Sequence, residues 1–179
     1  RYKSEKGLSL IESAMVLALG AVVTAGVMFY YQSASDANKT QAAISQVMSA
    51  TSAINGLYIG KSDYSGLSVD VLKNTSAIPE NYKTQNGINT PFGTALTVAP
   101  AAQNEVSNFG YKLSLTGLPK SACISLATLN LGTSAAGYGI ATGNPGHATW
   151  SNESKSPITP ARASTSCSGD VNVVTYFMK

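Results

Sequence analysis

The sequence has 179 residues, the length of an anchor plus one domain of ordinary size. Charged residues make up only 12% of it, and the formal net charge is +3. This excludes a strong basic field of the kind that binds nucleic acid, and abundant Gly, Ser, Thr, Ala and Asn favour an extracellular surface over a cytosolic enzyme. Three of the twelve basic residues and one of the nine acidic residues precede Leu8, so the remainder carries a formal charge of only +1.

An apolar run extends from Leu8 to Tyr31 and contains a single charge, Glu12. A helix of roughly 20 apolar residues spans a bilayer, so this run is long enough to cross one. A carboxylate in hydrocarbon costs about 2 to 3 kcal/mol, so Glu12 requires a partner. Two interpretations are open: an ordinary membrane anchor whose Glu12 lies near the headgroups, or a helix that leaves the membrane to pack against copies of itself.

A secretory signal peptide is a third interpretation of the same basic and apolar start. Small residues at Ala18 to Gly20 or at Thr24 to Gly26 could supply its cleavage site. The apolar region of a signal peptide is usually shorter than this run and lacks an internal glutamate. An uncleaved helix is therefore favoured.

The start of the run carries a family resemblance. Gly7, followed by the Leu-Ser-Leu-Ile-Glu of residues 8–12, resembles the leader junction of bacterial type IV prepilins. The resemblance implies that a dedicated aspartyl peptidase cleaves between Gly7 and Leu8 and then N-methylates Leu8. Leucine at the first mature position is typical of the type b branch, whereas the type a branch usually starts with Phe. The resemblance extends more loosely to Pro91–Gly93 and to a widely spaced cysteine pair.

Residues 1–7 are interpreted as a remnant of the prepilin leader. Their basic residues lie beside an apolar span and keep that end cytoplasmic, so the domain after Tyr31 is expected outside the cytoplasm. An alternative cleavage upstream of Arg1 would place Glu5 at the fifth position of the mature chain. That alternative is disfavoured because Arg1 to Lys6 is polar, whereas the family's mature chains are apolar from the first residue.

The helical pattern continues past Tyr31, so one helix is expected from Leu8 to Asn55, with Gly56 or Gly60 as its stop. About 48 residues give a length of roughly 70 Å. The apolar half, residues 8–31, is expected to protrude, and the amphipathic half covers residues 32–60. One side of the amphipathic half carries Ile44, Val47, Met48, Ile54 and Tyr58, and other sides carry Asp36, Lys39, Gln46 and Ser49.

Four small residues of the apolar half permit close approach between neighbouring helices: Gly20, Ala21, Ala25 and Gly26. In a filament core, the protonated amine of Leu8 is expected to pair with Glu12 of a neighbour or of its own chain. Desolvation offsets much of the attraction between the two charges. The predicted role of Glu12 is therefore to set the assembly register, because a misplaced subunit leaves two buried charges unpaired.

Residues 61–179 are expected to form a globular head. Lys61 to Pro91 is interpreted as a connecting loop with a short helix at Val69 to Lys73. Further expected elements are strands at Ala95–Ala99, Phe109–Thr116, Tyr138–Thr142 and Val171–Met178, a short helix from Pro119 to a stop at Gly132, and a loop containing Pro145, Pro157 and Pro160.

Alternation predicts one buried and one solvated face for Phe109–Thr116, with Phe109 on the buried face. Val171–Met178 is apolar on both faces, as in a strand covered on both sides. A long helix packed on a mostly antiparallel sheet gives an α+β fold. The resemblance implies the type IV pilin fold with the last strand inside the sheet.

Cys123 and Cys167 are the only cysteines. An even pair in an exported domain predicts a disulfide, and two unpaired buried thiols are the alternative. Closing a loop of about 45 residues stabilises a fold by roughly 4 kcal/mol in the chain-entropy model. The bond would tie the C-terminal loop to the short helix.

The sequence offers little support for a catalytic motif, and no cofactor site or metal site is expected. The single histidine, His147, lies in a Pro-Gly-His turn and is interpreted as a loop residue. Two cysteines and one histidine do not make a four-ligand zinc site without carboxylates that no motif supplies. Gly137, Gly139 and Gly143 lack the spacing and the following helix of a phosphate loop.

The sequence therefore predicts a structural subunit, similar to the major pilin of a type IVb pilus, that polymerises through its N-terminal helix. The resemblance implies storage in the bacterial inner membrane, processing by the prepilin peptidase, extraction by an ATP-driven assembly machine and an extracellular homopolymer. Adhesion to host cells, aggregation and conjugative contact with recipient cells are all open. Partner contacts are expected in exposed loops at residues 62–89 and 147–166.

Two alternatives to a major pilin are kept. The first is a minor pilin or a type II secretion pseudopilin. Pseudopilins commonly carry a calcium site in a C-terminal loop, and Asp170 is the only carboxylate after Glu153, which weakens the pseudopilin hypothesis. The second is a membrane-anchored exported enzyme or binding protein, which would need a pocket and would form no filament.

Overall fold

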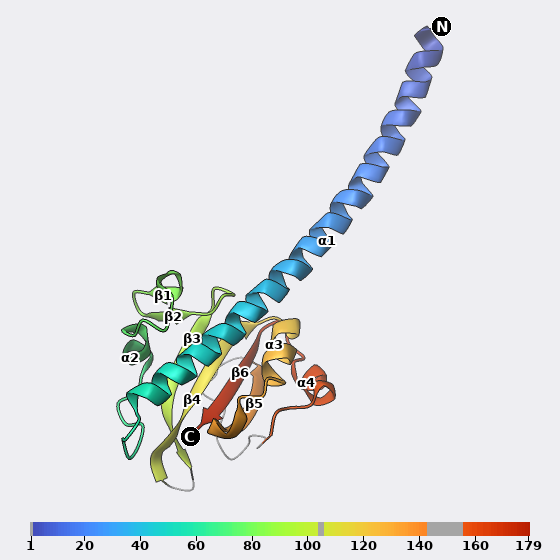
Figure 1. Cartoon of the computed structure of the whole chain (residues 1–179). Coiled ribbons are helices and arrows are strands. Elements are labelled where there is room, and N and C mark those ends of the chain that lie inside the picture. The colour runs from blue at the N-terminus through green and yellow to red at the C-terminus, as the bar shows by residue number, and fades with distance from the viewer. Residues whose placement is uncertain (1, 104–105, 143–155) are drawn as a thin grey trace. The chain divides into compact units, whose positions relative to one another are not determined.

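The computed structural model describes residues 2–103, 106–142 and 156–179. The chain divides into two compact units, residues 1–38 and residues 39–179. One helix, α1 (Tyr2–Leu57), forms the described part of the first unit and continues into the second (Figure 1). It begins before Leu8 and runs through Gly56, so a stop at Gly56 was wrong. Gly60 lies in the turn that follows, with a φ of +78° that suits glycine.

The part of α1 in the second unit, residues 39–57, buries one stripe of side chains. Four fully buried residues follow one another at spacings of three and four: Ala43, Val47, Ala50 and Ile54. Two neighbours differ from expectation, because Met48 is 49% exposed and Gln46 only 4%. Gln46 Nε2 donates a hydrogen bond to the backbone oxygen of Asn89 at 2.9 Å, and this bond satisfies part of the buried amide.

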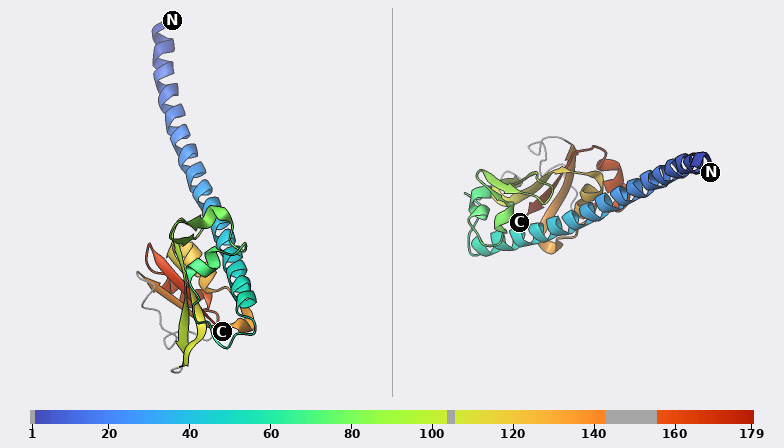
Figure 2. Two further views of the ribbon diagram at one scale, coloured as in Figure 1. Left: turned by 90° about the vertical axis from the view of Figure 1, so that its left-hand side faces the viewer. Right: turned by 90° about the horizontal axis from the view of Figure 1, so that it is seen from above.

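The described residues contain a six-stranded sheet in the order β1-β2-β3-β4-β6-β5. Its strands are β1 (Lys83–Thr84), β2 (Gly87–Asn89), β3 (Ala95–Gln103), β4 (Val106–Leu118), β5 (Ala135–Thr142) and β6 (Asn172–Met178). Each pair of neighbours is antiparallel. The last strand thus lies inside the sheet, between β4 and β5, as the resemblance implied. Residues 39–57 of α1 cross one face of this sheet (Figures 1 and 2).

The strand β6 is buried along its whole length. Val174, Tyr176 and Met178 belong to the same core cluster as the buried stripe of α1. Val173 and Phe177 alternate with them and are also buried. The expectation of a strand covered on both sides is confirmed.

The face of β4 that its alternation predicted to be solvated is solvated only in part, because Lys112 and Thr116 are half-buried. Ser114 is 1% exposed, and its Oγ lies 2.9 Å from Oγ1 of Thr175 in the neighbouring strand β6. Phe109, expected on the buried face, is 42% exposed. The prediction of a wet face was wrong at Ser114, because the pair of hydroxyl groups allows both polar side chains to be buried.

The strand β3 is longer than expected because it continues through Pro100. In the described part of the sheet, β2 pairs with β3 only at Ala95 and Leu96. Beyond that point Pro100 pairs with Tyr111 on the β4 side alone. A proline is tolerated on such an edge, where its missing N–H breaks no ladder bond.

Within residues 2–103, 106–142 and 156–179, three short α-helices accompany the sheet. α2 (Val69–Lys73) has the predicted bounds. α3 (Lys120–Ala127) has Pro119 as its N-cap and ends before the expected stop at Gly132, which instead starts the 3-10 turn η2 (Gly132–Ser134). α4 (Pro160–Ser166) lies in a segment expected to be a loop. The predicted loop before Pro91 also contains the 3-10 turn η1 (Glu80–Tyr82), β1 and β2.

Two buried tyrosines on the core face of the sheet differ in how their hydroxyl groups are satisfied. The Tyr176 hydroxyl donates to the backbone oxygen of Leu126 in α3. The Tyr111 hydroxyl has no hydrogen-bond partner within the described part of the chain, although its ring packs 4.9 Å from that of Tyr64. Burial raises the pKa of both phenols above the ordinary value.

Candidate assembly surface

The side chains in the apolar half of α1, residues 8–31, are not covered by other parts of the chain where the structure describes them. Every side chain from Ser9 to Tyr31 is exposed, and the large apolar ones are between 61% and 77% exposed. The helix from Ser9 onward is long and apolar enough to cross a membrane, by its length and composition. A surface this apolar requires a cover of lipid or protein.

The predicted cleavage and register residues lie on this helix. Gly7 and Leu8 are helical positions of α1, but the side chains of residues 1–8 lie outside the described part of the structure. Glu12 is exposed and follows Leu8 by four residues, which is about one helical turn. Cleavage, N-methylation and pairing of the amine with Glu12 stay predictions.

The four small residues predicted to pack in a filament core are exposed: Gly20, Ala21, Ala25 and Gly26. A Cβ added at either glycine would meet no atom within 4 Å. Thr24 Oγ1 donates a hydrogen bond to the backbone oxygen of Gly20 at 2.8 Å, so its hydroxyl is satisfied without a neighbour. A side chain added at either glycine would therefore meet no atom of the same chain, and close helix packing there stays a prediction.

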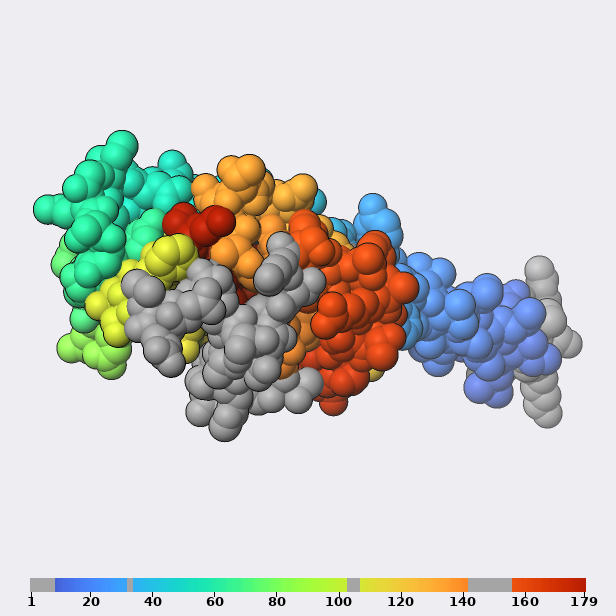
Figure 3. Space-filling view, turned by 90° about the horizontal axis from the view of Figure 1, so that it is seen from below, coloured from blue at the N-terminus to red at the C-terminus, as the bar shows by residue number. Residues whose placement is uncertain are grey.

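The structure contains the disulfide that the sequence predicted. Cys123 of α3 is bonded to Cys167, the residue after α4, with an S–S distance of 2.02 Å and a Cα–Cα distance of 5.9 Å. Both residues are buried. The bond ties α4 to α3, and Figure 3 shows α4 (orange-red) at the surface of the second unit.

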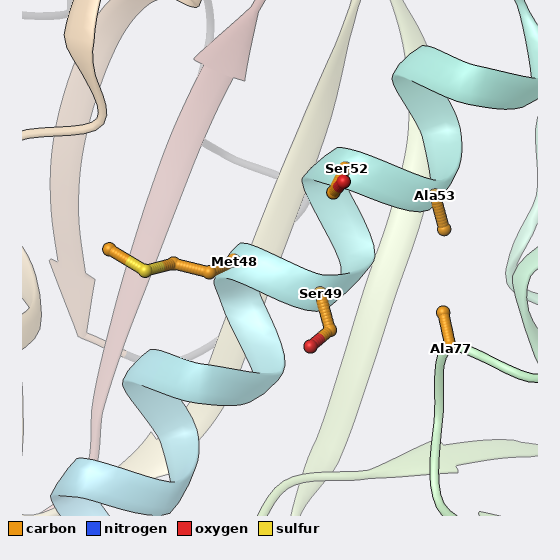
Figure 4. A pocket seen from close by; sticks show the side chains of 5 residues that line it. All are labelled: Met48, Ser49, Ser52, Ala53 and Ala77. Carbon is orange, nitrogen blue, oxygen red and sulfur yellow. The ribbon is translucent and has the colours of Figure 1, made fainter.

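A hollow of about 450 Å³ lies on the second unit between α1 and the segment around Ala77. Figure 4 shows its lining residues: Met48, Ser49, Ser52 and Ala53 on α1, and Ala77, whose side chain faces that of Ala53. A second hollow of about 190 Å³ shares Ser49 and Ala77 and reaches Gln46 and Tyr82. The linings offer hydroxyl and apolar contacts.

The first predicted contact loop, residues 62–89, is a structured segment. Lys83 Nζ contacts Glu80 Oε1 at 2.8 Å and donates to the backbone oxygen of Thr75 at 3.0 Å. Lys73 Nζ donates to the backbone oxygen of Gln85 at 2.8 Å. These bonds hold α2, η1 and β1 together. The sequence missed this order because each lysine reaches a backbone oxygen several residues away.

A tight turn at the start of this segment is held by Asp63. Its Oδ1 accepts a hydrogen bond from the backbone N–H of Ser65 at 3.0 Å. This bond favours the carboxylate and lowers the pKa of Asp63 below its usual value of 3.8. The backbone N–H of Tyr64 also donates to the oxygen of Asn108, which fastens the turn to β4.

The second predicted contact loop is described only in part. His147, Gly143 and Pro145 lie outside the described residues. Residues 156–166 are described, and within them Ala161, Arg162, Ser164 and Thr165 of α4 are exposed. Gly137 and Gly139 lie within β5, so they belong to a strand rather than to a phosphate loop.

Comparison with known proteins identifies the family. The family model described as Bundlin matches residues 32–174. Two relatives are 62% identical over 187 residues, covering 99% of this chain and 96% of each relative. The chain belongs to the Bundlin family. Both relatives are described as the major structural subunit of bundle-forming pilus, one from Escherichia coli O111:H- and one from Escherichia coli O127:H6 (strain E2348/69 / EPEC).

Solved structures share the fold of this Bundlin family member. TcpA, a type IV pilin from Vibrio cholerae El Tor biotype, matches with a TM-score of 0.53 and 16% identity, over 79% of this chain and 99% of TcpA. A type IV b pilin from Salmonella typhi matches with a TM-score of 0.52 and 19% identity, over 74% and 96% of the two chains. The α+β pilin fold and the resemblance to type IVb pilins are confirmed.

Proposed function

We propose that the chain is the major structural subunit of a type IVb pilus, a filament built from many copies of one protein. The observation that carries this function is the 62% identity, over 99% of the chain, to two major structural subunits of bundle-forming pilus. Both relatives are major subunits, so a minor pilin or a pseudopilin receives less support. The chain functions by polymerising into a filament. Its functional residues are therefore those that contact neighbouring subunits.

The polymerising element is the apolar half of α1, residues 8–31. Burying one large apolar side chain stabilises a protein by about 1.5 to 3 kcal/mol relative to water. Lipid tails provide the same shelter, so apolar burial alone does not draw the helix out of a bilayer. Extraction therefore needs energy from outside the chain, and an ATP-driven assembly machine supplies it.

Specificity in the filament core comes from shape and charge. The small residues Gly20, Ala21, Ala25 and Gly26 let neighbouring helices approach closely. Glu12 pairs with the amine of Leu8 on a neighbouring subunit. Because one unpaired buried charge costs about 3 to 5 kcal/mol, subunits out of register are rejected.

The amine at Leu8 requires processing. Residues 1–7 act as the leader, and the prepilin peptidase cleaves after Gly7 and methylates Leu8. Residues 8–31 then form the core-facing half of the helix, residues 32–60 its amphipathic half and residues 61–179 the head. The subunit waits in the inner membrane and later lies in an extracellular filament, where it serves adhesion, aggregation or mating contact.

The test compares filament yields in cells that carry the assembly machinery. Electron microscopy of sheared surface material, with immunodetection of the subunit, measures assembly, and the mass of the membrane-held chain measures cleavage. Glu12→Ala and Glu12→Gln should be inserted and cleaved normally, yet yield at least about a hundredfold less filament, because each leaves a buried amine unpaired. Asp170→Asn removes one exposed acid from the head and should assemble normally.

The outcomes separate two claims. Absence of the wild-type chain from any fibre would contradict the structural-subunit function. Normal filaments from Glu12→Gln would contradict only the register role of Glu12. Equal losses in Glu12→Gln and Asp170→Asn would point to a general charge effect instead.

A further inference from the structure

Three consecutive aromatic residues close the apolar run of α1. Phe29, Tyr30 and Tyr31 are 75%, 77% and 72% exposed. The sequence contains no other aromatic residue between Lys3 and Met28, and the polar Gln32 follows directly. The aromatic side chains are therefore concentrated at one level of the helix axis.

The three rings do not lie on one face of the helix. Consecutive residues are about 100° apart around an α-helix, so three in a row cover about 200°. A seam between two helices uses positions three and four residues apart. A single neighbouring helix would therefore leave at least one of the three rings outside the contact. A partner that surrounds the helix at one position along its axis fits this geometry better.

The length of the run identifies such a partner. Residues 8–28 span about 31 Å as a helix, and the hydrocarbon core of a bilayer is about 30 Å thick. Lys6 lies just beyond one end of this span and the aromatic triplet just beyond the other. Tyrosine rings, apolar with one polar tip, are enriched at the level of the headgroups.

We propose that Phe29, Tyr30 and Tyr31 form an interfacial anchor that fixes the depth of the unassembled subunit in a lipid bilayer. This inference rests on the proposed function, because it concerns the membrane-held stage before assembly. The rings lie at the headgroup level of the leaflet opposite Lys6. Since the helix between them is continuous, anchoring this end also fixes the level of the Gly7–Leu8 bond at the other end.

Cysteine accessibility in intact membranes tests the anchor. The full chain is expressed in cells without the assembly machinery, with single cysteines at positions 28, 32, 33, 35 and 37. The native cysteines are both in the disulfide, so the added thiol is the one that reacts. A membrane-impermeant maleimide is added from the side of the head. In the wild-type background, position 28 should be protected and positions 33 to 37 should react.

The decisive variant replaces the triplet: Phe29→Leu, Tyr30→Leu and Tyr31→Leu together. The helix stays apolar but loses its interfacial rings, so it can slide or tilt in the bilayer. The boundary between positions protected from the maleimide and positions that react should therefore move by about one helical turn toward position 35. Val22→Leu, Val23→Leu and Val27→Leu together are the matched control, because these side chains are also exposed and apolar, and the boundary should stay in place. Tryptophan at all three aromatic positions should keep it too.

An unchanged boundary in the leucine triplet overturns the anchor and leaves packing between copies as the role of the rings. Reaction at position 28 in the wild-type background also overturns it. Non-reducing mobility checks that the head is oxidised in each variant. The proposed function is judged separately, by filaments from the wild-type chain in cells with the machinery, so the failure of one claim is distinguishable from the failure of the other.

Discussion

The two parts of α1 differ in what covers their apolar side chains. From Ser9 to Tyr31 the apolar residues surround the helix and are exposed, whereas from Lys39 to Leu57 four of them, Ala43, Val47, Ala50 and Ile54, form one buried stripe. A stripe indicates a partner on one side, which here is the sheet of the same unit. An apolar surface on all sides indicates an environment that surrounds the helix. One continuous helix can therefore be stabilised by its own chain in one part and by its surroundings in the other.

The largest expected effect is confined to the second unit. Replacing Cys123 and Cys167 by Ala together should lower its free energy of unfolding by about 4 kcal/mol, because the bond closes a long loop in the unfolded chain. The sequence separation of the two cysteines is 44. Urea unfolding followed by tyrosine fluorescence measures the loss. Reductant should destabilise the wild-type head and leave the double variant unchanged; a stable, reductant-insensitive wild-type head would contradict the prediction.

A matched pair of truncations sharpens the comparison within α1. Ile54→Ala removes a fully buried side chain and should lower the free energy of unfolding of the second unit by about 3 kcal/mol, within the usual 2 to 5. Val23→Ala trims a side chain that is 63% exposed and should change the stability of the second unit by less than about 0.5 kcal/mol. The same urea experiment measures both variants. Similar losses for the two would break the distinction between the two parts of the helix.

A smaller effect tests the polar groups of the core. Tyr176→Phe removes one hydrogen bond to the backbone oxygen of Leu126, which also accepts from the backbone N–H of Leu129 at 3.3 Å, and should cost about 1 kcal/mol. Tyr111→Phe removes a buried hydroxyl that has no partner in the described part of the chain, so stability should stay the same or rise by up to about 1 kcal/mol. Thermal unfolding of both variants measures these changes. A larger loss of stability in Tyr111→Phe than in Tyr176→Phe would contradict the absence of a partner for the Tyr111 hydroxyl.

The smallest effect concerns pH. The pKa of Asp63 is lowered in the folded head, so its contribution is fully present above 3.8 and is lost as the pH falls through the lower folded value. In the Asp63→Asn variant, residue 63 has no carboxyl group to titrate. The difference in melting temperature between wild type and variant should be constant above pH 5 and change only below the usual pKa. Asp70→Asn, which removes an exposed acid of α2, is the control.

Local signals predicted several elements from the sequence. α2 has the predicted bounds, and β6 begins one residue after the predicted start. α4 was missed because its prolines and hydroxyl residues were read as a loop. Its start was nevertheless readable, since Thr159 accepts a hydrogen bond from the backbone N–H of Arg162 and Pro160 occupies the first turn.

Long-range partners explain what the sequence did not predict. Gln46 and Ser114 are buried because Asn89 and Thr175 lie opposite them in space, and no local pattern shows such partners. In the candidate site, the disulfide was predictable because the chain has only two cysteines. The roles of Glu12 and of the small residues near Gly20 depend on neighbouring copies, so they stay predictions.

The position of β6 has a consequence for biogenesis. β4 and β5 precede it in the sequence, yet each pairs with β6 and they are not neighbours in the sheet. Until residues 172–178 have emerged from the ribosome and been translocated, the two earlier strands lack the neighbour that joins them. A chain truncated before β6 would display open edges on β4 and β5, and such edges can pair with another chain, so the order of the whole sheet depends on its last strand.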